Sequence, residues 1–224
     1  MSTTAGAALP GTYDAVGRLL ARPSSGWILD APCGEGQFST ALQRAGHRVV
    51  AGDLAYERLR SSSVPVVGFD LNASLPFHDD SFDAVVAVEG IEHLESPYLF
   101  LRELFRVLRP HGTLIVTTPN ILNLRSRMKF SLLGSFYWFD ADGYRRGGHV
   151  NPLPLYELRH ILEEVGFTIQ QVCVNRRTTG MWAAALVLGP FLRLTEALRG
   201  GPVWLNSTDL LSGEVLVIAA GKTS

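Results

Sequence analysis

The stretch ILDAPCGEGQFSTAL, residues 28–42, decides the fold of this chain. It opens with an apolar run, residues 27–29, that stops at an acid, Asp30. A turn follows that contains Gly34 and Gly36, and because glycine has no Cβ, the backbone there can turn sharply and approach a ligand closely. A helix-like sequence completes the stretch. A strand, a glycine turn and a helix in this order are typical of a nucleotide-like ligand site at the carboxyl end of a strand.

Apolar runs and helical patterns alternate outward from this stretch. We expect strands at Trp27–Asp30, Val49–Asp53, Val64–Phe69, Phe82–Val88, Thr113–Thr118, Phe167–Val174 and Gly213–Ala220. We expect helices at Tyr13–Leu20, Phe38–Arg44, Glu57–Arg60, Pro97–Leu108, Pro154–Val165 and residues 181–199. This alternation predicts βαβ units and an α/β fold: a Rossmann-like, doubly wound, mostly parallel seven-stranded sheet with an antiparallel edge strand.

The chain carries no internal repeat and no linker, so we expect one domain over residues 1–224. Within it we distinguish an N-terminal helical segment at 1–26 and a cofactor-binding core at 27–120. Two helical cap insertions, at 121–153 and 175–212, follow strands five and six.

The composition excludes several classes of protein. A formal net charge of −1 gives no general attraction to nucleic acid. The two cysteines lie far apart without metal-ligand spacing, which predicts a reducing compartment and no metal site. The N-terminus lacks the pattern of a signal peptide, and the longest apolar run, 181–192, is shorter than the about 20 residues of a membrane span. We therefore expect a cytoplasmic protein without a transmembrane segment.

Three predicted strands end in acids, Asp30, Asp53 and Asp70. Ligands of a doubly wound sheet bind at the carboxyl ends of its strands. Asp53 follows the glycine turn by about 20 residues, where a carboxylate can accept hydrogen bonds from both ribose hydroxyls. This much fits NAD and S-adenosylmethionine equally well.

The residues of the turn distinguish the two cofactors. The dinucleotide fingerprint has a third glycine where this chain has Ser39, and the acids Asp30 and Glu35 flank the turn. A pyrophosphate prefers a helix N-terminus free of negative charge. S-adenosylmethionine has no phosphate and carries a sulfonium and an ammonium, which acids suit, while Asp70 suits an adenine amino group. The sequence therefore favours S-adenosylmethionine.

Four segments carry a resemblance to a known family: ILDAPCGEGQFS, VVAGDL, FDLNASLPFHDDSFDAVVAVEGIEHLE and LRELFRVLRPHGTLIVTTPN. In this order and spacing, over about residues 27–120, they resemble class I S-adenosylmethionine-dependent methyltransferases, in the small-molecule group that includes ubiquinone-biosynthesis-like enzymes. The resemblance implies that the methionine end of the cofactor is lined by Asp30, Ala31, Gly34, Gly36 and Glu89, the ribose by Asp53 with Leu54, and the adenine by Asp70 with Leu71. Two residues depart from the family pattern, Pro32 and His111, which both stand where glycine is usual.

Several of these residues have an alternative, structural interpretation. Asp30 can cap the following turn and Asp70 can be a surface acid. We interpret Cys33 as a packing residue rather than a nucleophile. His93, in EGIEHLE, and His149, in RRGGHVNP, either hold loops by hydrogen bonds or face the acceptor as general bases, since histidine titrates in the useful range.

Residues 121–153 interrupt the sheet pattern directly after strand five with aromatic residues and arginines. One interpretation is an acceptor site in which aromatic rings contact a ring or sugar and arginines bind a carboxylate or phosphate. We take Arg125, Tyr137, Trp138 and Arg145 as its candidate residues. The other interpretation is a packed cap with a solvated basic edge. The pieces TPNILNLRSRMKF and GHVNPL resemble methyltransferases associated with polysaccharide and glycan biosynthesis, which implies an oxygen of a sugar or another biosynthetic intermediate as acceptor.

Residues 181–199 leave three interpretations open: a helical cap, a dimer contact, or a helix on a membrane surface. The function that we expect is methyl transfer from S-adenosylmethionine to a small-molecule acceptor. The alternatives are a non-catalytic module that binds the cofactor and an NAD-dependent oxidoreductase.

Overall fold

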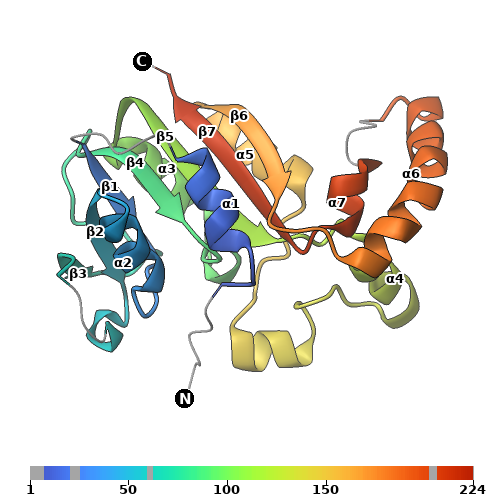
Figure 1. Ribbon diagram of the computed structural model, residues 1–224, viewed down its shortest axis with the longest axis horizontal. Helices are drawn as coiled ribbons and strands as arrows, with labels where there is room; N and C mark the ends of the chain where they lie inside the picture. Colours follow the sequence, from blue (N-terminus) through green and yellow to red (C-terminus); the bar gives the residue numbers. More distant parts are fainter. Residues whose placement is uncertain (1–7, 21–25, 60–62, 202–205, 224) are drawn as a thin grey trace.

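One mixed sheet of seven strands forms the centre of the protein, in the order β3-β2-β1-β4-β5-β7-β6 (Figure 1). A computed structural model describes residues 8–20, 26–59, 63–201 and 206–223. The strands are β1 (Trp27–Asp30), β2 (Arg48–Asp53), β3 (Val66–Gly68), β4 (Phe82–Ala87), β5 (Leu108–Pro119), β6 (Phe167–Val174) and β7 (Val215–Lys222). The helices are α1 (Thr12–Leu19), α2 (Gln37–Arg44), α3 (Pro97–Val107), α4 (Leu124–Leu133), α5 (Leu155–Val165), α6 (Thr179–Leu198) and α7 (Thr208–Ser212). Short 3₁₀ turns η1 (Tyr56–Arg58) and η2 (Ile91–His93) and a π-helical turn η3 (Gly143–Gly147) complete the structure.

The sheet confirms the predicted fold class. Strands β1 to β5 pair in parallel, whereas β7 runs antiparallel to both of its neighbours, β5 and β6. The antiparallel strand lies one place in from the edge, because β6 pairs with its outer side. The strand order reverses between β1 and β4, which places the expected ligand crevice at their carboxyl ends.

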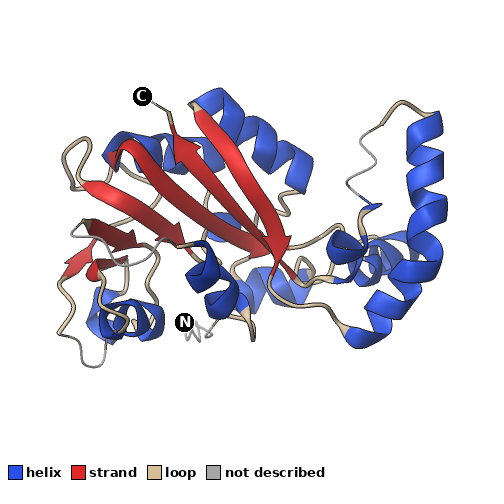
Figure 2. Cartoon of the chain, turned by 45° about the horizontal axis from the view of Figure 1, so that its top comes forward, coloured by secondary structure: helices blue, strands red, loops and turns tan. Residues whose placement is uncertain are grey.

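Alternate residues of the strands build two separate layers of core. Ile28 and Val86 face α1 and α2, while their neighbours Leu29 and Val85 face α3 and α5. Side chains of a strand alternate between the faces of the sheet, so a strand that is buried on both faces is apolar throughout. Figure 2 shows the resulting arrangement, with helices on both sides of the sheet.

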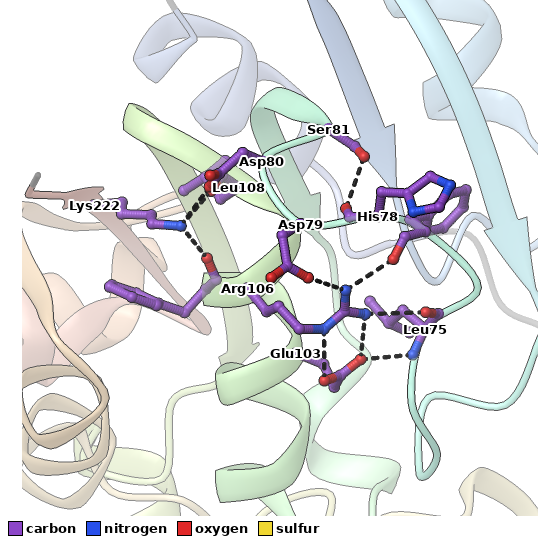
Figure 3. A network of polar contacts seen from close by, with 11 residues as sticks. Leu75, His78, Asp79, Asp80, Ser81, Glu103, Arg106, Leu108 and Lys222 are labelled. Atoms are coloured by element: carbon purple, nitrogen blue, oxygen red, sulfur yellow. Dashed lines mark hydrogen bonds and ion pairs between the residues drawn. The ribbon is translucent and has the colours of Figure 1, made fainter.

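The LPFHDDSFD motif anchors the loop between β3 and β4 to helix α3. The guanidinium of Arg106 donates to the carboxylates of Glu103 and Asp79 and to the carbonyls of Leu75 and Phe77 (Figure 3). Lys222, at the end of β7, forms an ion pair of 2.8 Å with Asp80 of the same loop. Two charged residues of the motif, Asp79 and Asp80, thus hold the loop in place through Arg106 and Lys222. Their presence needs no role in ligand binding.

Most predicted elements are confirmed, with small shifts at their ends. Strand β5 starts at Leu108 and so includes the predicted turn before it. His111 in that turn adopts a φ of 64°, a left-handed conformation that favours glycine. The predicted helix Glu57–Arg60 corresponds to η1, and Arg60 itself lies outside the described residues.

Helix α6 confirms the predicted helix at 181–199 to within two residues at each end, and much of it is exposed. It packs on α7 and α4 through one face around the buried Ala185, and it stands apart from the sheet in both views (Figures 1 and 2). Its other faces are apolar and exposed, as in Val187 at 76% and Leu198 at 78%. Residues Gly180–Leu198 reach the length and composition of a membrane-crossing helix, which the shorter apolar run did not predict, and only 11% of the most apolar window is buried. A core helix of a soluble protein also passes this test of length and composition. Passing it therefore does not decide between a helical cap, a dimer contact and a helix on a membrane surface.

Candidate functional site

A cavity of about 620 Å³ opens where β1, β2, β4 and β5 end. Its walls come from the glycine turn after β1, the segment after β2, the segment around η2, the N-terminal segment, and η3 with its flanks. The lining residues are Ala8, Leu9, Tyr13, Asp30, Pro32, Cys33, Gly34, Glu35, Gln37, Phe38, Asp53, Leu54, Ala55, Val88, Glu89, Glu92, His93, Pro119, Trp138, Arg146, Gly147 and His149. The topology thus gathers residues from distant parts of the chain around one hollow.

Asp30 is a buried acid at the end of β1, with 1% of its surface exposed. One carboxylate oxygen accepts a hydrogen bond of 2.5 Å from the hydroxyl of Ser39, and the other has no hydrogen-bond partner among the described residues. Burial raises the pKa of Asp30 to about 7, and the nearby carboxylate of Asp53 adds to the shift while Ser39 opposes it. A cationic ligand group would stabilise the ionised form of this side chain.

The glycine turn and Asp53 hold each other in place. The carboxylate of Asp53 accepts hydrogen bonds from the backbone N–H of Gly34 at 2.9 Å and of Ala55 at 2.8 Å. Gly36 has a φ of 76°, and a Cβ there would lie 2.9 Å from the side chain of Leu59. Only glycine fits this position without strain. The carboxylate of Asp53 is thereby fixed at the rim of the cavity.

Cys33 lies in the same turn as a buried thiol. Burial, with smaller contributions from the carboxylates of Asp30 and Asp53, raises the pKa of Cys33 to about 12. The thiol therefore stays protonated at neutral pH, which agrees with the packing role expected for it.

Glu89, directly after β4, connects the cavity to the N-terminal segment. Its φ of 47° lies in the left-handed region that side-chain-bearing residues seldom adopt, and such conformations gather at ligand sites. Its carboxylate accepts hydrogen bonds from the N–H of Leu9 at 3.1 Å and from the hydroxyl of Thr12 at 3.4 Å. Burial raises the pKa of Glu89. The N-terminal segment is thus part of the cavity wall, where Tyr13 stacks on Phe38 with ring centroids 4.7 Å apart.

The structure brings together some of the predicted cofactor residues and leaves others apart. Asp30, Gly34, Asp53, Leu54 and Glu89 line the cavity. The remaining predicted cofactor residues do not line it: Ala31, Gly36, Asp70 and Leu71. The carboxylate of Asp70 is exposed and accepts two hydrogen bonds from Asn72, at 2.8 and 3.2 Å. This contact matches the alternative of a surface acid that holds a turn.

The two predicted catalytic histidines both line the cavity and lie next to each other. The rings of His93 and His149 lie 4.8 Å apart between centroids, and Glu92 completes a cluster with them. Desolvation and the neighbouring His149 lower the pKa of His93. Glu92 has 0% of its surface exposed, and burial raises its pKa to about 8.

The predicted acceptor residues lie in three places. Trp138 lines the cavity. Arg125 instead lies over the ring of Tyr137, 3.9 Å from its centroid, so these two side chains stabilise the cap. Arg145 lines a second hollow beside η3, which shares His149 with the cavity.

Sequence reasoning missed several residues of the cavity. Glu92, Arg146 and Tyr13 line it and were not candidates. The available signal for Glu92 was its place beside His93 in the EGIEHLE segment, directly after the predicted strand. The sequence carried no comparable signal for Tyr13 or Arg146.

The residues of the cavity fit S-adenosylmethionine in their chemistry. Asp30 offers a buried carboxylate oxygen that has no partner among the described residues, as a sulfonium or ammonium group requires. Asp53 lies at the end of β2 with its carboxylate held at the rim, where ribose hydroxyls can donate to it.

Comparison with known proteins connects this site to methyltransferases. Residues 29–116 match a family model described as a methyltransferase domain. The chain is 33% identical over 191 residues to a Mycobacterium tuberculosis protein named "Probable S-adenosylmethionine-dependent methyltransferase", which covers 83% of this chain and 61% of the relative. It is 36% identical over 211 residues to the methyltransferase GfsG of Streptomyces halstedii, and the aligned part makes up 87% of this chain and 73% of GfsG. It is 30% identical over 181 residues to the mitochondrial ubiquinone biosynthesis O-methyltransferase of Rattus norvegicus, and the aligned part makes up 72% of this chain and 50% of the rat protein.

Solved structures share the fold. The S-adenosylmethionine-dependent methyltransferase from Archaeoglobus fulgidus superimposes with a TM-score of 0.64 at 18% identity, over 94% of this chain and 92% of that one. The chain spans about three fifths of the length of the mycobacterial relatives.

Proposed function

The chain belongs to the class I S-adenosylmethionine-dependent methyltransferases, and we propose that it transfers the methyl group of this cofactor to an oxygen atom of a small-molecule acceptor. The observation that carries the proposal is one cavity with two chemically different ends. We take the carboxylates at the ends of β1 and β2, Asp30 and Asp53, as one end, and His93, His149 and Trp138, which follow β4 and β5 in the chain, as the other. The first end suits a cationic cofactor with a ribose, and the second suits an acceptor with a hydroxyl.

Each side chain has a definite task in this proposal. Bound S-adenosylmethionine supplies an electrophilic methyl group on a sulfonium. Asp53 accepts hydrogen bonds from the ribose hydroxyls, and Asp30 and Glu89 attract the positive charge of the methionine part. Trp138 and Arg146 orient the acceptor, and His93 or His149 assists loss of the hydroxyl proton at a ring nitrogen. Alignment of two reactants in this way can supply about 7–11 kcal/mol.

The oxygen acceptor is supported by the relatives whose names include O-methyltransferase. The aromatic and basic residues at the acceptor end, Trp138 and Arg146, suit a ring or sugar that carries a hydroxyl beside an anionic group. We propose a sugar, a glycan precursor or a similar biosynthetic intermediate. We place the reaction in the cytoplasm, and a second copy of the chain is a candidate partner for the exposed face of α6.

The cofactor is tested first by calorimetry with S-adenosylhomocysteine and by thermal unfolding with this ligand or with NAD. We expect S-adenosylhomocysteine to bind and to raise the melting temperature, and NAD to leave the melting temperature unchanged. Stabilisation by NAD alone would instead support an oxidoreductase, and would contradict the proposal.

The acceptor is tested by incubating the chain with labelled S-adenosylmethionine and pools of hydroxylated sugars and phenols. His93→Ala and His149→Ala should each lower turnover by roughly 10²-fold. His160→Ala removes an exposed histidine of α5 and serves as the control. Near-wild-type rates in both cavity variants would remove the histidines from the mechanism, and failure of every acceptor pool beside intact cofactor binding would favour a non-catalytic module.

A further inference from the structure

One carboxylate and two imidazoles meet at the acceptor end of the cavity in the pattern of a metal site. A carboxylate oxygen of Glu92 and one ring nitrogen each of His93 and His149 lie within 4.8 Å of one another. We propose that these three side chains bind one divalent transition-metal cation, which holds and polarises the hydroxyl of the acceptor. The cysteine spacing predicted no metal site, and His149 lies far from Glu92 and His93 in the chain.

Backbone carbonyls fix the tautomer of both histidines. Nδ1 of His93 lies 3.1 Å from the carbonyl oxygen of Gly148, and Nδ1 of His149 lies 3.0 Å from that of Trp138. A carbonyl oxygen can only accept, so each Nδ1 carries the hydrogen and donates it. The lone pair of each Nε2 is then available to a ligand. Metal-binding histidines are oriented by such a hydrogen bond from the second ring nitrogen.

Glu92 supplies a buried carboxylate whose polar neighbour is the hydroxyl of Thr118, itself without a hydrogen-bond partner among the described residues. It has 0% of its surface exposed, and neither of its carboxylate oxygens has a hydrogen-bond partner among the described residues. Buried polar atoms are nearly always paired, and buried charges pair with an opposite charge or coordinate a metal. Glu89 differs, since Leu9 and Thr12 both donate to its carboxylate. A cation between Glu92 and the two imidazoles would satisfy the carboxylate.

Hydrogen bonds hold the two halves of the cluster together. The backbone carbonyl of Glu92 accepts from the N–H groups of Val150 and Asn151, both at 3.0 Å. The side-chain amide of Asn151 donates to the carbonyl of Leu94. The segment that carries His149 is thereby joined to the η2 turn that carries Glu92 and His93. The cluster is therefore part of the folded scaffold, as a metal site requires.

The donor set selects the class of cation. Two histidines and one carboxylate are the ligands of catalytic zinc sites and of non-haem iron sites, which keep positions open for a substrate. Ligand atoms bound at about 2.0–2.2 Å from one ion are at most about 4.4 Å apart. In a tetrahedral site such atoms lie about 3.4 Å apart, so the three side chains would need to close by up to about 1.4 Å from their spacing of within 4.8 Å. Zinc, or another divalent cation of similar softness, fits this cluster.

The role of the cation rests on the proposed function, whereas its binding does not. A Lewis acid at this position would polarise the acceptor hydroxyl. With the cation bound, both Nε2 atoms are ligands, so the cation takes the place of the histidine base: the O–H proton leaves to water, and an electron pair of the oxygen forms the new O–CH₃ bond. The S–CH₃ bond breaks, and its electron pair stays on sulfur as a neutral thioether.

Binding is tested on the full, untagged chain after treatment with a chelator. Calorimetry with Zn²⁺ and visible absorption with Co²⁺ are compared for the wild type, Glu92→Gln, His149→Ala and the control His160→Ala. We expect one equivalent in the wild type and the control, and at least roughly tenfold weaker binding in the other two. Circular dichroism and thermal unfolding of the metal-free variants verify that they fold. Equal binding in all four proteins, or a cobalt–thiolate absorption band that identifies Cys33 as a ligand, would overturn the site.

Activity separates this inference from the proposed function. Chelation should abolish most methyl transfer, Zn²⁺ should restore it, and S-adenosylhomocysteine should bind throughout. Full activity in the chelated protein would refute the role of the cation and leave the methyltransferase intact. Cation binding without methylation of any acceptor would support the site and contradict the function.

Discussion

Replacing Asp30 by asparagine should make the stability of the protein, relative to that of the wild type, increase as pH rises. The pKa of Asp30 is raised from 3.8 to about 7, first by burial. Between these two values the folded chain keeps a proton that the unfolded chain loses, so the stability of the wild type falls as pH rises through this window. One unit of pKa corresponds to about 1.4 kcal/mol, so the full window amounts to about 4 kcal/mol. Asparagine does not titrate, and the variant lacks this loss.

The assay is urea unfolding of both ligand-free proteins from pH 4.5 to 8. The difference in unfolding free energy, variant minus wild type, should increase over this range by about 3 kcal/mol. Asp70→Asn, which neutralises an exposed acid, is the matched control and should show little change. Calorimetry adds a second readout: wild-type affinity for S-adenosylhomocysteine should rise toward pH 7 as the carboxylate ionises and attracts the ammonium group, and Asp30→Asn should lack that rise. A stability difference independent of pH would refute the assignment of a raised pKa to this side chain.

Three further substitutions test the cavity and the loop. Asp53→Ala should weaken S-adenosylhomocysteine binding by about 10- to 100-fold, through loss of charged hydrogen bonds, while Asp70→Ala measured beside it shows whether the exposed acid contributes to the same affinity. Gly36→Ala should lower stability by about 1 kcal/mol or more, because its φ of 76° and the contact with Leu59 both oppose a Cβ; an unchanged melting temperature would contradict this. Arg106→Ala should lower the free energy of unfolding by about 2–3 kcal/mol and leave cofactor affinity nearly unchanged. Arg102→Ala, on the same helix, is the control and should change neither quantity. A strong loss of cofactor affinity in the Arg106 variant would mean that the anchored loop has a role in binding.

The sequence by itself determined the strands, the glycine turn and the acids at the strand ends. Consecutive apolar residues such as Val85–Ala87 point to both faces of the sheet, so the sequence of this segment alone predicts a strand that is buried on both faces. The placement of Asp30 and Asp53 at one crevice follows equally, since parallel strands of a doubly wound sheet end at the same edge. These features depend on local pattern and on a common topology.

The tertiary structure alone decided what surrounds that crevice. The segment around His149 joins the η2 turn through the carbonyl of Glu92, and the N-terminal segment reaches the carboxylate of Glu89. Charged residues of the LPFHDDSFD motif, prominent in the sequence, instead bind Arg106 and Lys222 away from the cavity. The physical reason is that each of these contacts joins residues far apart in the chain. Which residues meet depends on how the caps pack against the folded sheet. The periodicity of a single segment carries no information about that packing.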